Sequence, residues 1–160
     1  MMQTLYVALG ANLGDRAENL RQAIREMAAR IGEPLAVSAF RETQPVGFTS
    51  PHAFLNAAAA FRTEHDAPTL LRMTQEIERQ LGRTHKSRDG QYADRCIDID
   101  LLLLADTVWQ SPELTLPHPH LHERDFVLDP LAEIAPTVVH PTLHCTIAEL
   151  AARLHRTSCK

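Results

Sequence analysis

The stretch Ile97-Asp98-Ile99-Asp100-Leu101-Leu102-Leu103-Leu104 predicts a strand with two chemically different faces. Side chains alternate along a strand, so the two isoleucines and Leu101 leave one face while the two aspartates leave the other. Helices can cover the isoleucine face and form a core there. The sequence therefore predicts a sheet with one helix-covered face and a second face that is left bare.

The elements before this strand alternate in a recognisable order. Apolar periodicity, turn residues and helix caps predict a strand at Thr4 to Leu9, a helix between Asp15 and Gly32, strands at Leu35 to Thr43 and Ala53 to Arg62, and a helix between Asp66 and Gly82. Short helices follow near Asp125 to Ala135 and Thr146 to Leu154. The βαββαβ order is that of α+β ferredoxin-like folds, in which an antiparallel sheet carries both helices on one face.

Length and composition favour a soluble protein with one domain over residues 1–160. The chain has 160 residues, of which 44% are hydrophobic and 22% charged. The net charge of −4 disfavours a nucleic-acid binder, because duplex affinity comes largely from Lys and Arg contacts to phosphate. Apolar runs such as Leu101 to Ala105 fall far below the roughly 18 residues of a membrane span. No cationic residue precedes Arg16 and no CxxC pair occurs, which favours the cytoplasm. We also expect a monomer.

Asp98 and Asp100 are the strongest chemical signal in the chain. Their carboxylates leave the strand roughly 6.5 to 7 Å apart. At an effective dielectric constant near 20, they repel by on the order of 2 to 3 kcal/mol. Two Mg²⁺ ions fit between two such carboxylates when phosphate oxygens and waters complete the coordination. The alternatives are two solvated aspartates on an exposed face, or aspartates paired with nearby arginines; we favour metal binding.

A second polar group lies near the end of the second predicted helix. Gln75 and Glu78 are one turn apart, and Arg83 follows the helix directly. An ordinary solvated helix end is one interpretation, but with two aspartates about a strand away the same residues could receive a polyphosphate chain. No Gly-Lys-Ser or Gly-Lys-Thr follows Gly10 or Gly14, so phosphate binding must come from side chains and metals rather than from a P-loop.

The histidine-rich stretch Pro117-His118-Pro119-His120-Leu121-His122 does not predict a zinc site, because it lacks a helical His pair and companion cysteines. The prolines favour an extended chain with alternate histidines pointing one way. We expect one of them to contact a phosphate while the others stay solvated. His140, His144 and His155 are expected at the surface.

Eight blocks stand in a fixed order along the chain: Gly10–Asp15, Glu42–Gly47, Phe54–Ala58, Gln75–Glu78, Gly82–Arg83, Arg95–Leu101, Leu116–His118 and Arg124–Leu128. In order and spacing, over roughly Tyr6 to Pro136, they resemble the 6-hydroxymethyl-7,8-dihydropterin pyrophosphokinase family. Any one block alone is a weak signal, whereas the whole set is highly specific. The chain departs from the family pattern before Arg95, where Tyr92-Ala93-Asp94 replaces Trp-Gly-Pro.

The resemblance implies a folate-biosynthesis enzyme that transfers the β,γ-pyrophosphoryl group of ATP to the hydroxymethyl oxygen of the pterin, giving AMP. It implies that Asp98 and Asp100 hold two Mg²⁺ ions and act in catalysis with Arg83 and Arg95. The ATP-binding residues that it implies are Gln75, Glu78, Leu101, Thr115, His118 and Arg124. The pterin-binding residues that it implies are Gly10, Thr43, Val46, Phe54, Asn56, Tyr92 and Phe126.

Two other functions fit parts of the same pattern. A non-catalytic ferredoxin-like module could bind a nucleotide or RNA on its open face, but RNA readers stack bases on strand aromatics and the Ile97 to Leu104 strand has none. A Mg²⁺-dependent phosphohydrolase could use the same two aspartates. Turnover of ATP with and without the pterin separates the three hypotheses.

Overall fold

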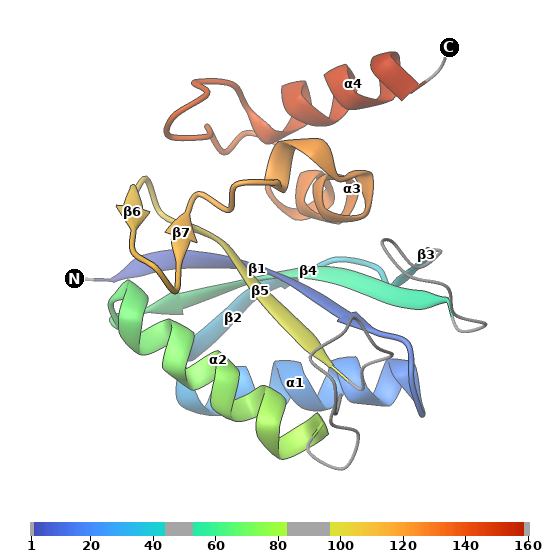
Figure 1. The fold of residues 1–160 in the computed structure, drawn as a ribbon, viewed down its shortest axis with the longest axis vertical. Coiled ribbons are helices and arrows are strands. Elements are labelled where there is room, and N and C mark those ends of the chain that lie inside the picture. The colour runs from blue at the N-terminus through green and yellow to red at the C-terminus, as the bar shows by residue number, and fades with distance from the viewer. Residues whose placement is uncertain (1, 44–52, 83–96, 159–160) are drawn as a thin grey trace.

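An antiparallel sheet forms the middle layer of the protein and has helices on both faces (Figure 1). The computed structural model describes residues 2–43, 53–82 and 97–158. The helices are α1 (Arg16–Arg30), α2 (Ala67–Gly82), the 3₁₀ turn η2 (Leu121–Glu123), α3 (Asp125–Ile134) and α4 (Ile147–Ser158). The strands are β1 (Gln3–Ala11), β2 (Gly32–Val37), β3 (Arg41–Thr43), β4 (Phe54–Thr63), β5 (Asp98–Leu104), β6 (Trp109–Gln110) and β7 (Thr115–Leu116).

The main sheet has the strand order β2-β4-β1-β5, and β3 pairs with β4 beyond the end of β2. Every pairing in it is antiparallel. The predicted strands at Thr4 to Leu9, Ala53 to Arg62 and Ile97 to Leu104 are confirmed, as β1, β4 and β5, with bounds shifted by at most two residues. β6 and β7 form a separate hairpin, which the sequence did not predict.

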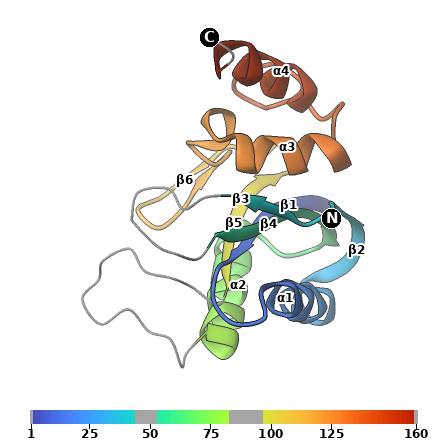
Figure 2. The same cartoon turned by 90° about the vertical axis from the view of Figure 1, so that its right-hand side faces the viewer.

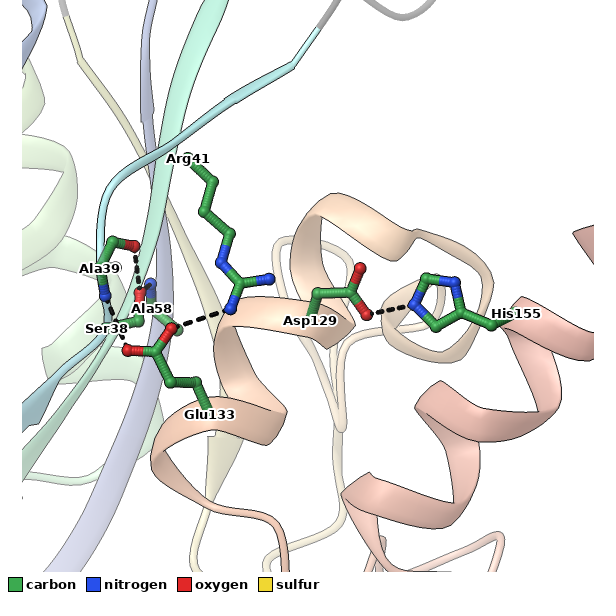
Figure 3. A network of polar contacts seen from close by, with 7 residues as sticks. All are labelled: Ser38, Ala39, Arg41, Ala58, Asp129, Glu133 and His155. Carbon is green, nitrogen blue, oxygen red and sulfur yellow. Dashed lines mark hydrogen bonds and ion pairs between the residues drawn. The ribbon is translucent and has the colours of Figure 1, made fainter.

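The single strand predicted at Leu35 to Thr43 is wrong, because the structure divides this segment into β2 and β3. The register places residues 38–40 opposite residues 57–58, so the link between β2 and β3 has one residue more than the part of β4 that it faces. Ser38 occupies this bulge: its Oγ accepts the Ala58 N–H at 2.9 Å, and its own N–H donates to the Ala58 carbonyl at 2.8 Å (Figure 3). An extra residue bends a strand and interrupts its pairing, which separates β2 from β3.

α1 and α2 cover one face of the sheet with the apolar stripes that the sequence predicts. The fully buried members of these stripes include Leu20, Met27, Leu70 and Ile77. Burial of each such side chain contributes about 1.5 to 3 kcal/mol. The predicted caps are confirmed, since Asp15 Oδ1 accepts the Glu18 N–H at 3.1 Å and Asp66 Oδ1 accepts the Thr69 N–H at 3.0 Å. Within the described ranges, none of the helices combines the length and apolarity needed to cross a bilayer.

The second face of the sheet is covered in part by α3, so the expectation of a bare face is wrong there. Leu128 and Leu131 of α3 are fully buried in a cluster with Ala58 of β4 and Leu102 of β5. α4 packs on the outer side of α3 rather than on the sheet (Figure 2). Reciprocal hydrogen bonds between Thr146 and Glu149 form a capping box at the start of α4. Asp98 and Asp100, at the start of β5, are not part of this second core.

Polar contacts fasten α3 to its neighbours (Figure 3). Glu133 Oε2 accepts the Ala39 N–H at 2.8 Å, and Glu133 Oε1 lies 2.9 Å from Arg41 Nη2. His155 Nε2 of α4 lies 2.7 Å from Asp129 Oδ1 of α3. Exposed ion pairs contribute little to stability. Here the Glu133 contacts fix where α3 lies, because they join it to Ala39 before β3 and to Arg41 at the start of β3.

His140 is buried, with only 3% of its surface exposed, so the expectation that it lies at the surface is wrong. Its Nδ1 accepts the Leu143 N–H at 3.1 Å and the Thr142 N–H at 3.3 Å, which closes the turn before α4. Burial lowers the pKa of His140. His144 and His155 are exposed, as expected.

Candidate functional site

One row of the sheet brings the predicted metal and pterin residues together. Gly10 of β1 pairs with Asp98 of β5 on one side and with Asn56 of β4 on the other. Residues paired directly in an antiparallel sheet project to the same face. Asp98 and Asn56 therefore flank Gly10 on one face. Asp100 joins them, since it lies two residues along the strand from Asp98.

Gly10 lies at the centre of this row and has no side chain. A Cβ atom at Gly10 would lie 3.1 Å from Asn56 Oδ1 and 3.6 Å from Phe54 Cδ1. The first distance is tighter than an ordinary van der Waals contact, so a larger residue would push the Asn56 amide aside. The glycine thus allows the Asn56 amide oxygen to lie close to β1, beside the acidic strand.

Thr43, Phe54 and Asn56 form the other half of the row. Thr43 of β3 pairs with Phe54 of β4, and Asn56 lies two residues further along the same strand. The Asn56 Nδ2 group donates to Thr43 Oγ1, which fixes the amide so that its oxygen faces Gly10. Asn56 is only 7% exposed. A held amide presents an acceptor and a remaining donor hydrogen to the edge of a heterocycle.

Glu78 reaches from α2 to the start of β5. Its Oε2 accepts the Ile99 backbone N–H at 2.7 Å. Burial raises the pKa of the Glu78 carboxyl to about 8; the Ile99 N–H opposes the rise, while the charges of Asp98 and Asp100 add to it. Three carboxyl groups therefore lie close enough at this end of β5 to disfavour full ionisation.

Hard carboxylate oxygens are the protein ligands that Mg²⁺ takes, commonly one or two of them, with phosphate oxygens and waters for the rest. Asp98 and Asp100, both half-buried, provide such a pair. Although Glu78 is near them, no three His, Cys, Asp or Glu side chains among the described residues are arranged so that they alone could hold a metal ion. These two carboxylates therefore fit an ion whose remaining ligands are phosphate oxygens and waters. They do not fit an ion that is coordinated by the protein alone.

His118, Arg124 and Phe126 approach the same place from the segment after β7. The His118 N–H donates to the Leu102 carbonyl at 2.9 Å, which holds the segment beside β5. Burial, together with the smaller effects of the Arg124 charge and of His120, lowers the pKa of His118 to about 4, whereas Asp98 acts in the opposite direction. Arg124 Cζ lies 5.9 Å from the centroid of the Phe126 ring. A neutral imidazole and the Arg124 charge thus lie near Asp98, and the Phe126 ring lies beside Arg124.

Three other predicted nucleotide residues are placed less directly. Leu101 is only 4% exposed and packs in the core on the α1 and α2 side, so only its backbone is available to a ligand. Thr115 is half-buried on β7, which lies beside β5. Gln75 is exposed on α2, one turn before Glu78. Among the described residues, Glu78 is held at the acidic strand by its hydrogen bond to Ile99. No comparable hydrogen bond to these residues holds the Gln75 side chain there.

Four predicted site residues, Arg83, Arg95, Val46 and Tyr92, lie outside the described residues. One residue at the site was missed by sequence reasoning. Arg16, the first residue of α1, donates from Nη1 to the Ala53 carbonyl at 2.9 Å, next to Phe54. In the sequence, only its position directly after the Gly10 to Asp15 turn suggests that Arg16 lies near the site. A single sequence does not show that its side chain contacts Ala53, the residue before β4.

A family profile matches most of the chain. The profile of the family described as "7,8-dihydro-6-hydroxymethylpterin-pyrophosphokinase (HPPK)" matches residues 6–136. A 2-amino-4-hydroxy-6-hydroxymethyldihydropteridine pyrophosphokinase of Porphyromonas gingivalis is 51% identical over 143 residues, which is 88% of this chain and 95% of that protein. The protein of the same name from Bacillus subtilis is 40% identical over 139 residues, 86% of this chain and 81% of its own length.

Solved structures share the fold. A crystal structure of an HPPK-DHPS protein in complex with substrates aligns with 99% of this chain with a TM-score of 0.77 at 13% sequence identity. The Plasmodium falciparum HPPK-DHPS structure with STZ-DHP aligns with all of the chain, with a TM-score of 0.75 at 15% identity. The chain spans less than half the length of these two proteins, 44% and 43% respectively. At such low identity, the likeness is one of fold.

Proposed function

The chain belongs to the 7,8-dihydro-6-hydroxymethylpterin-pyrophosphokinase (HPPK) family, and we propose that it transfers the β,γ-pyrophosphoryl group of ATP to 6-hydroxymethyl-7,8-dihydropterin. The products are AMP and the pterin pyrophosphate, an intermediate of folate biosynthesis. The observation that carries the proposal is the register of β1, in which Gly10 lies between Asp98 and Asn56. A pterin held at Asn56 has its hydroxymethyl group within reach of phosphates held at Asp98.

The pterin site consists of Gly10, Thr43, Phe54, Asn56 and Phe126, completed by Val46 and Tyr92. Asn56 is held by Thr43, so its amide needs no reorganisation to pair with the polar edge of the ring. Phe54 and Phe126 offer aromatic rings for stacking. Gly10 has no Cβ, so the Asn56 amide oxygen can lie close to β1.

The nucleotide site consists of Gln75, Glu78, Thr115, His118 and Arg124, with Leu101 contributing through its backbone. Because His118 Nδ1 accepts the His120 N–H at 3.1 Å, the proton of the neutral ring is on Nε2. That N–H can donate to a phosphate oxygen. Arg124 adds a positive charge beside it, and Arg83 and Arg95 supply two more.

Asp98 and Asp100 would hold two Mg²⁺ ions, because paired half-buried carboxylates with Glu78 beside them leave an excess of negative charge. When bound, Mg²⁺ neutralises negative charge on the transferring phosphates. The chain's own contribution is to position the two substrates and to stabilise charge. Phosphoryl-type transfers require this more than they require a covalent nucleophile.

We propose further that residues 1–160 form a single ferredoxin-like domain that acts as a cytoplasmic monomer without nucleic-acid or membrane partners. The strand order β2-β4-β1-β5, with α1 and α2 on one face, supports the ferredoxin-like topology. α3 and α4 are additions to it on the other face.

Incubation of the protein with ATP, Mg²⁺ and the hydroxymethyl pterin tests the proposal. AMP should form only when the pterin is present, and the pterin should gain two phosphates. ATP hydrolysis that does not depend on the pterin would favour a phosphohydrolase instead. Binding of ATP without turnover would favour a non-catalytic module.

A further inference from the structure

Arg16 contacts β3 and the residue before β4, the two strands that carry Thr43, Phe54 and Asn56. Its Nη1 donates to the Ala53 carbonyl oxygen at 2.9 Å, and its Nη2 lies 3.5 Å from Glu42 Oε2. Ala53 directly precedes Phe54 of β4, and Glu42 directly precedes Thr43 of β3. One guanidinium therefore spans the end of the β3–β4 pair.

The strands need such a contact because β3 has only three residues, all of them paired with β4. The last of these pairs joins Thr43 to Phe54, and the Thr43 hydroxyl holds the Asn56 amide. A displacement of Ala53 or Glu42 moves this pair directly. The distant Glu133 contacts act at the other end of β3, at Ala39 and Arg41 (Figure 3).

The two contacts of Arg16 differ in strength. The bond to Ala53 is charge-assisted and partly buried, which makes it stronger than a neutral hydrogen bond. The Glu42 side chain is 60% exposed and its oxygen is 3.5 Å away, so this ion pair is weak. The effect of Arg16 should therefore come mainly through the Ala53 carbonyl.

We propose that Arg16 is a positioning residue for the pterin site, acting by holding Ala53 and thereby Phe54 and Thr43. This inference rests on the proposed function, since it takes these residues as the pterin contacts. Nothing in it requires Arg16 to touch either substrate. Loss of the guanidinium should weaken pterin binding while leaving the nucleotide contacts on α2 and β5 intact.

The test compares Arg16→Gln, Arg16→Lys and Glu42→Gln with Arg21→Gln. The control Arg21 lies on the same helix and pairs with Glu18 at the surface. Calorimetry measures the affinity for the pterin, in the presence of Mg²⁺ and a non-hydrolysable ATP analogue, and separately the affinity for that analogue. Thermal unfolding is measured for each variant.

Arg16→Gln should weaken pterin affinity about tenfold and raise the pterin KM by a similar factor, with analogue affinity unchanged. Arg16→Lys should recover part of the loss, because an ammonium can still donate to one carbonyl. Glu42→Gln should have less effect than Arg16→Gln, and Arg21→Gln should have none.

Unchanged pterin affinity in Arg16→Gln, or equal loss of both affinities with a large fall in melting temperature, would overturn the positioning role. Failure of the unaltered protein to bind the pterin would instead overturn the proposed function, and the inference with it.

Discussion

Glu78 Oε2 lies 2.7 Å from the Ile99 backbone nitrogen and accepts its hydrogen bond, which ties α2 to the strand that carries Asp98 and Asp100. The contact places a third carboxyl group beside the proposed metal ligands. Its raised pKa, to about 8, shows that the fold favours the neutral form of Glu78 when no cation is bound.

The first prediction is that Glu78 destabilises the metal-free protein as pH rises. The folded-state pKa is above the unfolded value near 4.5, so the folded state binds more protons and stability falls between about pH 4.5 and 8. Glu78→Gln keeps an acceptor for Ile99 and removes the titration. In EDTA, urea unfolding should show that the stability of wild type relative to this variant decreases over that window. Parallel stability curves for the two proteins would contradict the expectation.

The second prediction concerns the aspartates. Asp98→Asn and Asp100→Asn should each lower turnover by roughly a hundredfold or more, because charge on the transferring group loses its compensation. Removal of a like charge should at the same time keep or raise the melting temperature without metal. Asp106→Asn, an exposed aspartate after β5, is the control. Near wild-type turnover of either site variant at saturating Mg²⁺ would exclude a metal-ligand role.

The third prediction concerns Asn56 and its partner. Asn56→Ala should weaken pterin binding by on the order of tenfold or more, with little effect on an ATP analogue. Thr43→Val removes the hydroxyl that holds the amide and should cause a smaller loss of pterin affinity. Calorimetry with each ligand measures both effects, and equal weakening for pterin and nucleotide would count against the assignment of Asn56.

The fourth prediction concerns Gly10. Gly10→Ala places a Cβ 3.1 Å from Asn56 Oδ1, so the amide must shift and pterin affinity should fall. If the substitution acts through Asn56, its effect should largely disappear in the Asn56→Ala background. A double-mutant cycle on pterin affinity measures this coupling, and additive effects of the two substitutions would show that Gly10 acts by another route.

Local signals in the sequence were sufficient for most of the fold. Caps at Asp15 and Asp66 and apolar stripes at helical spacing act within a few residues, so they are readable in one chain. The alternation of Asp98 with Ile99 is equally local, and the isoleucine side is buried as predicted. The acidic strand was therefore predictable from the sequence.

Features that depend on distant partners were not predictable. The division of β2 from β3 depends on a Ser38 hydroxyl that bonds to Ala58, and the covered second face depends on where α3 returns to the sheet. The two-residue strands β6 and β7 are too short to show alternation. The closeness of Asn56 to Asp98 depends on the register of both strands against Gly10, which no local pattern specifies.

The fate of the β-phosphorus of ATP distinguishes pyrophosphoryl transfer from single phosphoryl transfer and from hydrolysis. With ATP labelled at the β-phosphate, Mg²⁺ and the hydroxymethyl pterin, transfer of a pyrophosphoryl group should move all of the reacted label to the pterin and leave unlabelled AMP. With Asp98→Asn, the label should move to the pterin more slowly, by the same factor by which this substitution lowers turnover. Label retained in ADP would indicate transfer of a single phosphoryl group, and label released as free pyrophosphate without pterin would indicate hydrolysis. Either result would contradict the proposed reaction.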